Sequence, residues 1–273
     1  YRVYQVEVNA ETGRRLSLEQ DLRRAVERGE FRLHYQPKVD LRDGRIVGAE
    51  ALLRWQHPAR GLVPPGEFIP LAESSGLINV AGEWVLDEVC RQVAEWRRKA
   101  MSLPRIALNL SASQFQRQNA VDLLTRVLAA HGVSGNDIEL ELTEGALVSD
   151  DGQTIEMLMM FKRMGVSLAI DDFGTGYSSL SYLSRFPIDT LKIDASFVRD
   201  LTTCSASTEL VRSIIEMAHR LKLGVVAEGV ETAEQLAILR QYHCDSVQGF
   251  YFSPAVDADD FAALIRRNQP YPL

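Results

Sequence analysis

Polar side chains that can bind cations or transfer protons recur at the ends of apolar segments along this chain. Asp171 and Asp172 directly follow the apolar VSLAI, and Glu228 directly follows VVA. The same pattern holds for Glu50, Asn109, Glu141, Lys192 and Gln248. Any one of them could mark only the point where a strand reaches solvent. Their recurrence favours one shared site, because the carboxyl ends of the strands of an α/β barrel meet at one rim.

The excess of carboxylates in this set indicates a metal site. Four or more carboxylates in one cleft repel one another and take up protons unless a positive charge lies between them. Carboxylate and amide oxygens suit hard cations such as Mg²⁺, Mn²⁺ or Ca²⁺. Zinc is disfavoured, because the five histidines show no HxxxH or His-Asp spacing.

Lys192 and Glu228 have the chemistry that could assist a cation-activated water. Two hard cations about 3.5–4 Å apart can activate a water for in-line attack on phosphorus. Lys192 could orient that water or balance charge, although a single lysine in a strand is also a common ion-pair partner. Glu228 ends a very apolar strand and is a candidate general base.

The adjacent aspartates place a condition on the backbone. Neighbouring residues of a strand face opposite sides, so Asp171 and Asp172 reach one site only if the chain turns there. The segment FGTGYSSL follows directly. Its glycines permit positive φ, and we expect this segment to supply the turn and to offer amides to a phosphate.

The elements that must carry these residues begin with a hairpin. The segments FRLHYQPKV and RIVGAEALLRW are rich in β-branched and aromatic residues and are joined only by residues 40–44. That link is too short for a parallel crossover and predicts an antiparallel β-hairpin. Before it, residues 17–30 are good helix formers with Ser17 as a plausible N-cap, and predict a lead-in helix.

Beyond the hairpin, helix and strand patterns alternate. Helices are expected at 78–99, 123–130, 155–164, 180–183, 210–221, 233–242 and 257–267, and strands at 105–110, 138–142, 166–170, 190–193, 224–227 and 246–250. Trp84, Trp96 and the segment MLMMFKRM at 157–164 are expected to be buried helix faces. About eight strands, mostly parallel and separated by helices, predict an α/β fold: a modified TIM (β/α)8 barrel with one antiparallel strand from the hairpin.

Composition narrows the class of protein. The 273 residues, 46% of them hydrophobic, can bury a full core, and the formal net charge of −7 argues against a DNA-binding surface. Cys90, Cys204 and Cys244 form no disulfide framework or zinc ribbon and fit a reducing cytoplasm. No apolar run approaches the roughly 18 residues of a membrane span, so we expect no membrane contact.

Several motifs, in order, resemble those of the EAL domains, a family of cyclic di-GMP phosphodiesterases. Glu50-Ala51-Leu52 followed by LRW is similar to the signature of that family. The resemblance extends over about residues 17 to 267 and includes Gln36-Pro37 in YQPKVD, Asn109 in NLSASQF, ELTE at 141–144, DDFGTGYSSL at 171–180, Lys192 in LKID, EGVE at 228–231 and Gln248-Gly249. A three-letter match is weak, but this ordered combination is specific.

The resemblance implies a role for each matching residue. Two Mg²⁺ or Mn²⁺ ions would be bound by Glu50, Asn109, Glu141, Asp171 and Asp172, with Asp171 as the bridge. Lys192 would hold the water, Glu228 would act as base or outer metal ligand, and Glu144 would anchor the DFGTGYSS loop. Gln36, Leu53, Arg54 and Gln248 would contact the substrate. The implied reaction converts cyclic di-GMP to linear pGpG.

One departure from the family pattern is visible. The family usually has a basic residue and then proline after the FS of its last motif, whereas Ser253 is followed here by Pro254 and Ala255. The change affects no expected metal ligand, but it could alter substrate contacts at the rim.

Two alternative functions remain open at this stage. A silent receptor would bind cyclic di-GMP without turnover, but such members lose a metal ligand, the lysine or the base, and all are present here. An unrelated barrel phosphodiesterase or sugar-phosphate enzyme is permitted by the fold alone. The ordered motifs disfavour it.

The first residues suggest the domain context. The segment YRVYQVEVNAETGRR is similar to the tail that often follows a GGDEF domain, which predicts a linker at 1–16, the catalytic barrel at 17–273 and a GGDEF-like or sensory domain before them. The chain begins at Tyr1 rather than Met and could be a piece of a longer protein. The family resemblance also implies a homodimer.

Overall fold

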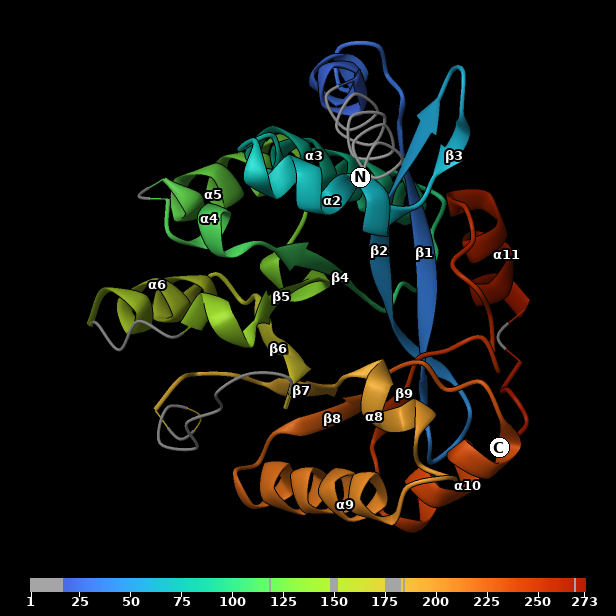
Figure 1. The fold of residues 1–273 in the computed structure, drawn as a ribbon. Helices are drawn as coiled ribbons and strands as arrows, with labels where there is room; N and C mark the ends of the chain where they lie inside the picture. The colour runs from blue at the N-terminus through green and yellow to red at the C-terminus, as the bar shows by residue number, and fades with distance from the viewer. Residues whose placement is uncertain (1–16, 118, 148–151, 175–182, 184, 268) are drawn as a thin grey trace, which may run out of the picture.

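The computed structural model forms a closed barrel of strands surrounded by helices (Figure 1). It describes residues 17–117, 119–147, 152–174, 183, 185–267 and 269–273. The predicted linker at 1–16, the segment TGYSSL at 175–180 and most of the helix predicted at 180–183 lie outside these residues.

Nine strands of the described residues form one sheet. They are β1 (Phe31–Asp40), β2 (Ile46–His57), β3 (Gly61–Val63), β4 (Arg105–Leu110), β5 (Ile138–Thr143), β6 (Ser167–Phe173), β7 (Thr190–Ile193), β8 (Gly224–Ala227) and β9 (Ser246–Val247). Their order is β1-β9-β8-β7-β6-β5-β4-β2-β3, and β1 also pairs with β2. That last pairing closes an eight-stranded ring and leaves β3 as an extension of β2.

The hairpin gives the ring its antiparallel member, as predicted. β1 runs antiparallel to β2 on one side and to β9 on the other, whereas the pairs from β2–β4 through β8–β9 are parallel. Gln36 of β1 lies opposite Glu50 of β2 in this register. The predicted modified TIM barrel is therefore confirmed.

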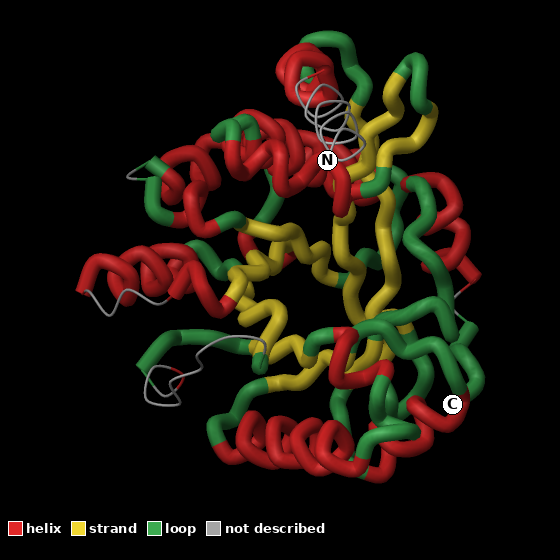
Figure 2. Tube along the Cα trace, viewed as in Figure 1, coloured by secondary structure: helices red, strands yellow, loops and turns green. Residues whose placement is uncertain are grey.

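Helices cover the outside of the ring (Figure 2). They are residues 17–25, α2 (Pro65–Ser74), α3 (Ile78–Arg98), α4 (Ala112–Phe115), α5 (Ala120–His131), α6 (Gly152–Arg163), α8 (Ala195–Arg199), α9 (Ser205–Arg220), α10 (Ala233–Gln241) and α11 (Ala258–Arg267). The 3₁₀ turns Gly135–Asp137 and Glu144–Leu147 flank β5. In the described residues, no helix is long and apolar enough to cross a membrane.

The sequence pattern missed the short elements. β3, α4 and α8 have 3, 4 and 5 residues, too few to show a period. The sequence pattern also did not predict the longer α2, which begins with Pro65 and contains Pro70, because proline is unfavourable inside a helix. The lead-in helix ends at residue 25 rather than 30, before a turn in which Gly29 has φ +63°.

Apolar side chains fill the layer between the strands and the helices. Leu140 and Leu142 of β5, Ile170 of β6 and Trp96 of α3 belong to this main core. A second cluster beneath residues 17–25 and α2 is built around Trp55, whose Nε1 donates to Glu30 Oε2 at 2.9 Å. These two cores hold the strand ends in place, and the charged residues lie inside the ring.

The prediction for the segment 157–164 is wrong in part. Leu158 and Phe161 are buried against the core, whereas Met159 and Met160 are 45% and 43% exposed. The helix period turns these two methionines away from the sheet.

Candidate active site

The inside of the barrel holds a group of charged side chains joined by ion pairs, here called the interior cluster. Its members are Lys38, Glu50, Glu139, Glu141, Asp171, Asp172, Lys192 and Glu228. Glu141 and Lys192 are each 1% exposed, whereas Asp171 at the carboxyl end of β6 is 8% exposed and Asp172 and Glu228 are only half-buried. The cluster therefore opens at the rim where catalytic residues of such barrels lie.

Lys192 lies at the centre of the cluster. Its Nζ is 2.6 Å from Glu141 Oε2, 2.6 Å from Glu228 Oε1 and 2.9 Å from Asp171 Oδ1. Glu50 Oε2 is further away, at 3.7 Å. Burial would lower the pKa of Lys192, but the surrounding carboxylates outweigh it and hold that pKa well above its usual value. The structure thus gathers four of the predicted residues around one ammonium group.

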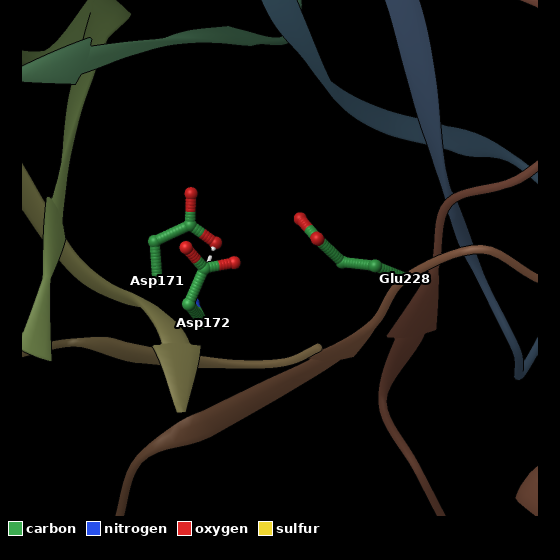
Figure 3. A group of neighbouring side chains, drawn as sticks. All are labelled: Asp171, Asp172 and Glu228. Atoms are coloured by element: carbon green, nitrogen blue, oxygen red, sulfur yellow. Dashed lines mark hydrogen bonds between the residues drawn. The ribbon is translucent and has the colours of Figure 1, made fainter. Parts of the chain in front are cut away.

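A β-bulge lets the two adjacent aspartates face the same space. Pairing between β6 and β7 shifts between Ile170 and Phe173, and Asp172 has φ 54°. The side chains of Asp171 and Asp172 then both point toward Glu228 (Figure 3), and ligand atoms of all three lie within 4.8 Å of one another. The turn is at Asp172 itself, which corrects the expectation that FGTGYSSL supplies it. Aspartate tolerates the left-handed region better than most residues.

Amide side chains form one wall of the rim. Gln248 Nε2 donates to Glu50 Oε2 at 2.7 Å and to Gln36 Oε1 at 3.1 Å, and Asn109 Nδ2 donates to the other oxygen of Glu50 at 2.7 Å. Gln36 Nε2 also donates to the carbonyl of Ser253 at 3.1 Å. The Oε1 of Gln248 is buried without a hydrogen-bond partner among the described residues. This orphaned acceptor fits a site that binds a cation or a ligand donor.

The remaining predicted residues lie away from the ion pairs. Arg54 is half-buried on β2, its Nη1 donates to the carbonyl of Leu53, and burial lowers its pKa. Leu53 is partly buried and packs against both cores. Glu144 begins the 3₁₀ turn after β5, and neither of its buried carboxylate oxygens has a hydrogen-bond partner in the described part of the chain.

Sequence reasoning missed two members of the interior cluster, Lys38 and Glu139. Lys38 Nζ is 2.6 Å from Glu139 Oε1 and 2.7 Å from Glu141 Oε1. A signal was available, since Lys38 follows Gln36 by two and Glu139 precedes Glu141 by two. Residues two apart in a strand share a face.

The pKa values of the carboxyl groups in the cluster are shifted in opposite directions, because burial raises them and the lysines lower them. Burial raises the pKa of Glu228 to about 8, with Lys192 opposing and Asp171 adding to the increase. It raises the pKa of Glu50, Asp171 and Asp172 as well. For Glu141, burial is outweighed by Lys192 and Lys38, which lower its pKa to about 2. A divalent cation would favour the ionised form of the groups that burial disfavours.

The charges of the cluster fit the binding of hard divalent cations. Its six carboxylates face two ammonium groups, which leaves a formal excess of four negative charges. Buried charge without compensation is costly. Divalent cations would offset this excess, and the oxygen ligands of the cluster suit hard cations.

The fold and this acidic site define an α/β barrel with a carboxylate-rich rim, and comparison with known proteins identifies its family. A model of the EAL domain matches residues 19–255. The chain belongs to the EAL-domain family, which agrees with the resemblance of its motifs.

Named relatives support the same assignment. Over 265 residues the chain is 43% identical to the bifunctional diguanylate cyclase/cyclic di-GMP phosphodiesterase MucR of Pseudomonas aeruginosa, covering 97% of this chain and 39% of MucR. It is 44% identical to the cyclic di-GMP phosphodiesterase NbdA of the same organism, over 94% of this chain and 33% of NbdA. The chain thus spans about a third to two fifths of these relatives.

A solved structure gives the same result for the fold. The structure of the PaMucR phosphodiesterase in complex with c-di-GMP is similar with a TM-score of 0.87 and 44% sequence identity, over 90% of this chain and 99% of that one.

Proposed function

We propose that the chain hydrolyses one 3′,5′-phosphodiester bond of cyclic di-GMP and releases linear pGpG, with two Mg²⁺ or Mn²⁺ ions. The observation that carries the proposal is the buried interior cluster, in which Lys192 contacts Glu141, Asp171 and Glu228 beside an excess of carboxylates. Family membership and the phosphodiesterase names of the relatives support the choice of substrate.

Five residues would hold the cations. They are Glu50, Asn109, Glu141, Asp171 and Asp172. The cations, when bound, supply Lewis-acid activation of a water and stabilise charge on the phosphate oxygens. Asp171 and Asp172 are suited to this because the bulge turns both carboxylates to one side.

Two residues act on the water and its proton. Lys192 contacts Glu141 and Glu228 at 2.6 Å and Asp171 at 2.9 Å, so these three carboxylates fix its ammonium group beside the position where the water would bind. Glu228 can accept the proton of the attacking water in its ionised form, which a bound cation would favour over the protonated form that burial favours.

The rim residues bind the substrate. Gln36 and Gln248 are joined by a hydrogen bond at 3.1 Å, and Arg54 lies four residues beyond Glu50 on the same face of β2, next to Leu53. A guanidinium suits a phosphate, and an amide suits the polar edge of a guanine. Pro254 and Ala255 follow Ser253, whose carbonyl holds Gln36, so the family departure acts on the position of Gln36.

Three further parts of the proposal concern regulation and context. Glu144, with both carboxylate oxygens buried and unpartnered in the described residues, anchors the loop that follows Gly174.

The chain forms a homodimer, for which the exposed Met159 and Met160 of α6 offer an apolar surface. Residues 1–16 are a linker to a GGDEF-like or sensory domain, residues 17–273 are the catalytic barrel, and the protein works in the cytoplasm.

The test measures the hydrolysis of cyclic di-GMP by the purified chain with Mg²⁺ or Mn²⁺. We expect pGpG to accumulate, and both EDTA and Glu50→Ala to abolish it. Glu67→Ala is the matched control, because Glu67 pairs with Arg60 on the outer surface at 2.7 Å. Tight binding of cyclic di-GMP without turnover, across both cations and several protein concentrations, would contradict the proposal and indicate a receptor.

A further inference from the structure

Glu141 is held from two sides by two lysines. Lys38 of β1 contacts its Oε1 at 2.7 Å, and Lys192 of β7 contacts its Oε2 at 2.6 Å. The side chain of Glu141 is 0% exposed and that of Lys38 is 6% exposed. Neither oxygen of Glu141 can turn without breaking a charge-assisted hydrogen bond, so its orientation is determined by the pair.

Lys38 approaches from the end of the barrel opposite to the rim. With Glu139 and Arg105 it lines a cavity of about 150 Å³ among the first residues of β5, β7, β8 and β9. The second carboxylate that Lys38 contacts, Glu139, also lies on this side. Lys38 therefore separates the cavity from Glu141 and from the catalytic rim.

The strand opposite makes room for this lysine. Gly48 of β2 is the cross-strand partner of Lys38. A Cβ at Gly48 would lie 3.3 Å from Cδ of Lys38, which is a tight contact. The aliphatic stem of Lys38 is thus packed against bare backbone and is directed across the barrel toward β5.

We propose that Lys38 is a positioning residue, which directs the free lone pairs of Glu141 toward the cation site from the closed end of the barrel. Lys38 touches neither the substrate nor the reacting atoms in this scheme. The inference rests on the proposed function, because it takes Glu141 as a cation ligand. A role in stability alone is the competing interpretation.

The two interpretations predict opposite signs for cation binding. Lys38→Met removes a positive charge near the site, and Coulomb attraction alone would then strengthen the binding of a divalent cation. If Lys38 positions Glu141, the same change weakens binding. Partners of metal ligands typically change affinity or activity by about 10–100-fold when removed.

The experiment titrates Mn²⁺ by calorimetry into the metal-free chain without substrate, and then measures kcat and KM for cyclic di-GMP. For Lys38→Met we expect Mn²⁺ affinity and kcat to fall by about ten-fold or more. KM for cyclic di-GMP should stay within about two-fold, and saturating Mn²⁺ should restore part of kcat.

Two variants serve as matched controls. Glu139→Gln leaves the contact between Lys38 and Glu141 intact, and Lys162→Met removes a lysine that pairs at 2.6 Å with Asp189 outside the cluster. Lys162→Met should leave Mn²⁺ affinity near that of the parent chain, whereas Glu139→Gln measures the Coulomb effect of one lost negative charge and should weaken Mn²⁺ binding less than Lys38→Met does.

The double variant Lys38→Met with Glu139→Gln keeps the formal charge of the cluster unchanged and leaves no unpaired Glu139. This double variant should still bind Mn²⁺ about ten-fold more weakly than the parent chain. If Lys38→Met alone does not fold, the double variant tests whether Lys38 positions Glu141. Parental Mn²⁺ affinity and kcat in these variants would overturn the role of Lys38 and leave the proposed function intact. Absence of Mn²⁺ binding to the parent chain would overturn both.

Discussion

The inside of the barrel and the layer outside it are built from the same strands but bury opposite kinds of side chain. Along β5, Ile138, Leu140 and Leu142 belong to the apolar core, whereas Glu139 and Glu141 alternate with them and carry ion pairs to lysines. Alternate residues of a strand face opposite sides. One strand of six residues therefore serves both regions.

The comparison separates stability from chemistry. Burial of apolar surface in the outer layer stabilises the fold by roughly 25 cal/mol per Å². Buried ion pairs contribute little net stability, because removing the charges from water costs about as much as their attraction returns. The charged side chains inside the barrel are thus retained for function. The apolar outer layer holds the strands that carry these side chains in place.

The largest expected effect comes from removing the central charge of the inner region. Lys192→Met leaves Glu141, Asp171 and Glu228 without their shared ammonium group. We expect hydrolysis of cyclic di-GMP to fall by about 10³-fold, and the melting temperature in EDTA to fall and recover partly with Mg²⁺. Steady-state kinetics and thermal melts measure both. Activity within ten-fold of the parent chain would contradict the central role of Lys192.

A cavity in the outer layer should give the opposite pattern. Leu239 of α10 is fully buried in the main core. Leu239→Ala should lower the free energy of unfolding by about 2–5 kcal/mol and leave kcat of the folded protein unchanged. Urea denaturation and active-site titration with Mn²⁺ would check this. A large loss of kcat in fully folded protein would show that the two regions are coupled.

Stability should depend on pH through the inner region when cations are removed. In the folded chain Glu228 has a pKa of about 8, compared with an ordinary value of 4.5. The folded state binds more protons between these values, so the free energy of unfolding falls as the pH rises from 4.5 to about 8. The raised pKa values of Glu50 and Asp171 act in the same direction.

Thermal melts in EDTA at pH 5, 6.5 and 8 would measure this slope, and Mg²⁺ should flatten it because a cation favours the ionised carboxylates. Glu228→Gln should flatten it as well. The same slope with and without Mg²⁺ would mean that cations do not bind among these groups.

The smallest effect is expected for charges on the outer surface. Arg91 of α3 pairs with Glu88 at 2.7 Å and Glu95 at 3.0 Å, and its side chain is 44% exposed. Arg91→Ala should shift the melting temperature by less than about 3 °C and leave hydrolysis unchanged. A shift comparable to that of Lys192→Met would contradict the contrast between inner and outer charges.

Local patterns were sufficient for the order of the main elements and for most of the site. The hydrophobic period of α3 and the short link between β1 and β2 are properties of neighbouring residues, so helix and hairpin were both predictable. Glu141, Lys192 and Glu228 were identified because an apolar strand that carries or ends in a charge is visible in a short window of sequence. The elements β3, α4 and α8 are too short to show a recognisable sequence pattern.

The contacts within the site depended on the tertiary structure. Lys38 and Glu139 are separated by 101 positions, and Gln36 and Gln248 by 212. They meet because closure of the ring places β1 beside both β2 and β9. The bulge at Asp172 likewise depends on how β6 pairs with β7. The sequence by itself determined the eight strands of the ring and which charges they carry, since these follow from local periodicity. Only the closed barrel decided which charges are paired, because pairing requires strands that are distant in the chain to lie across one interior.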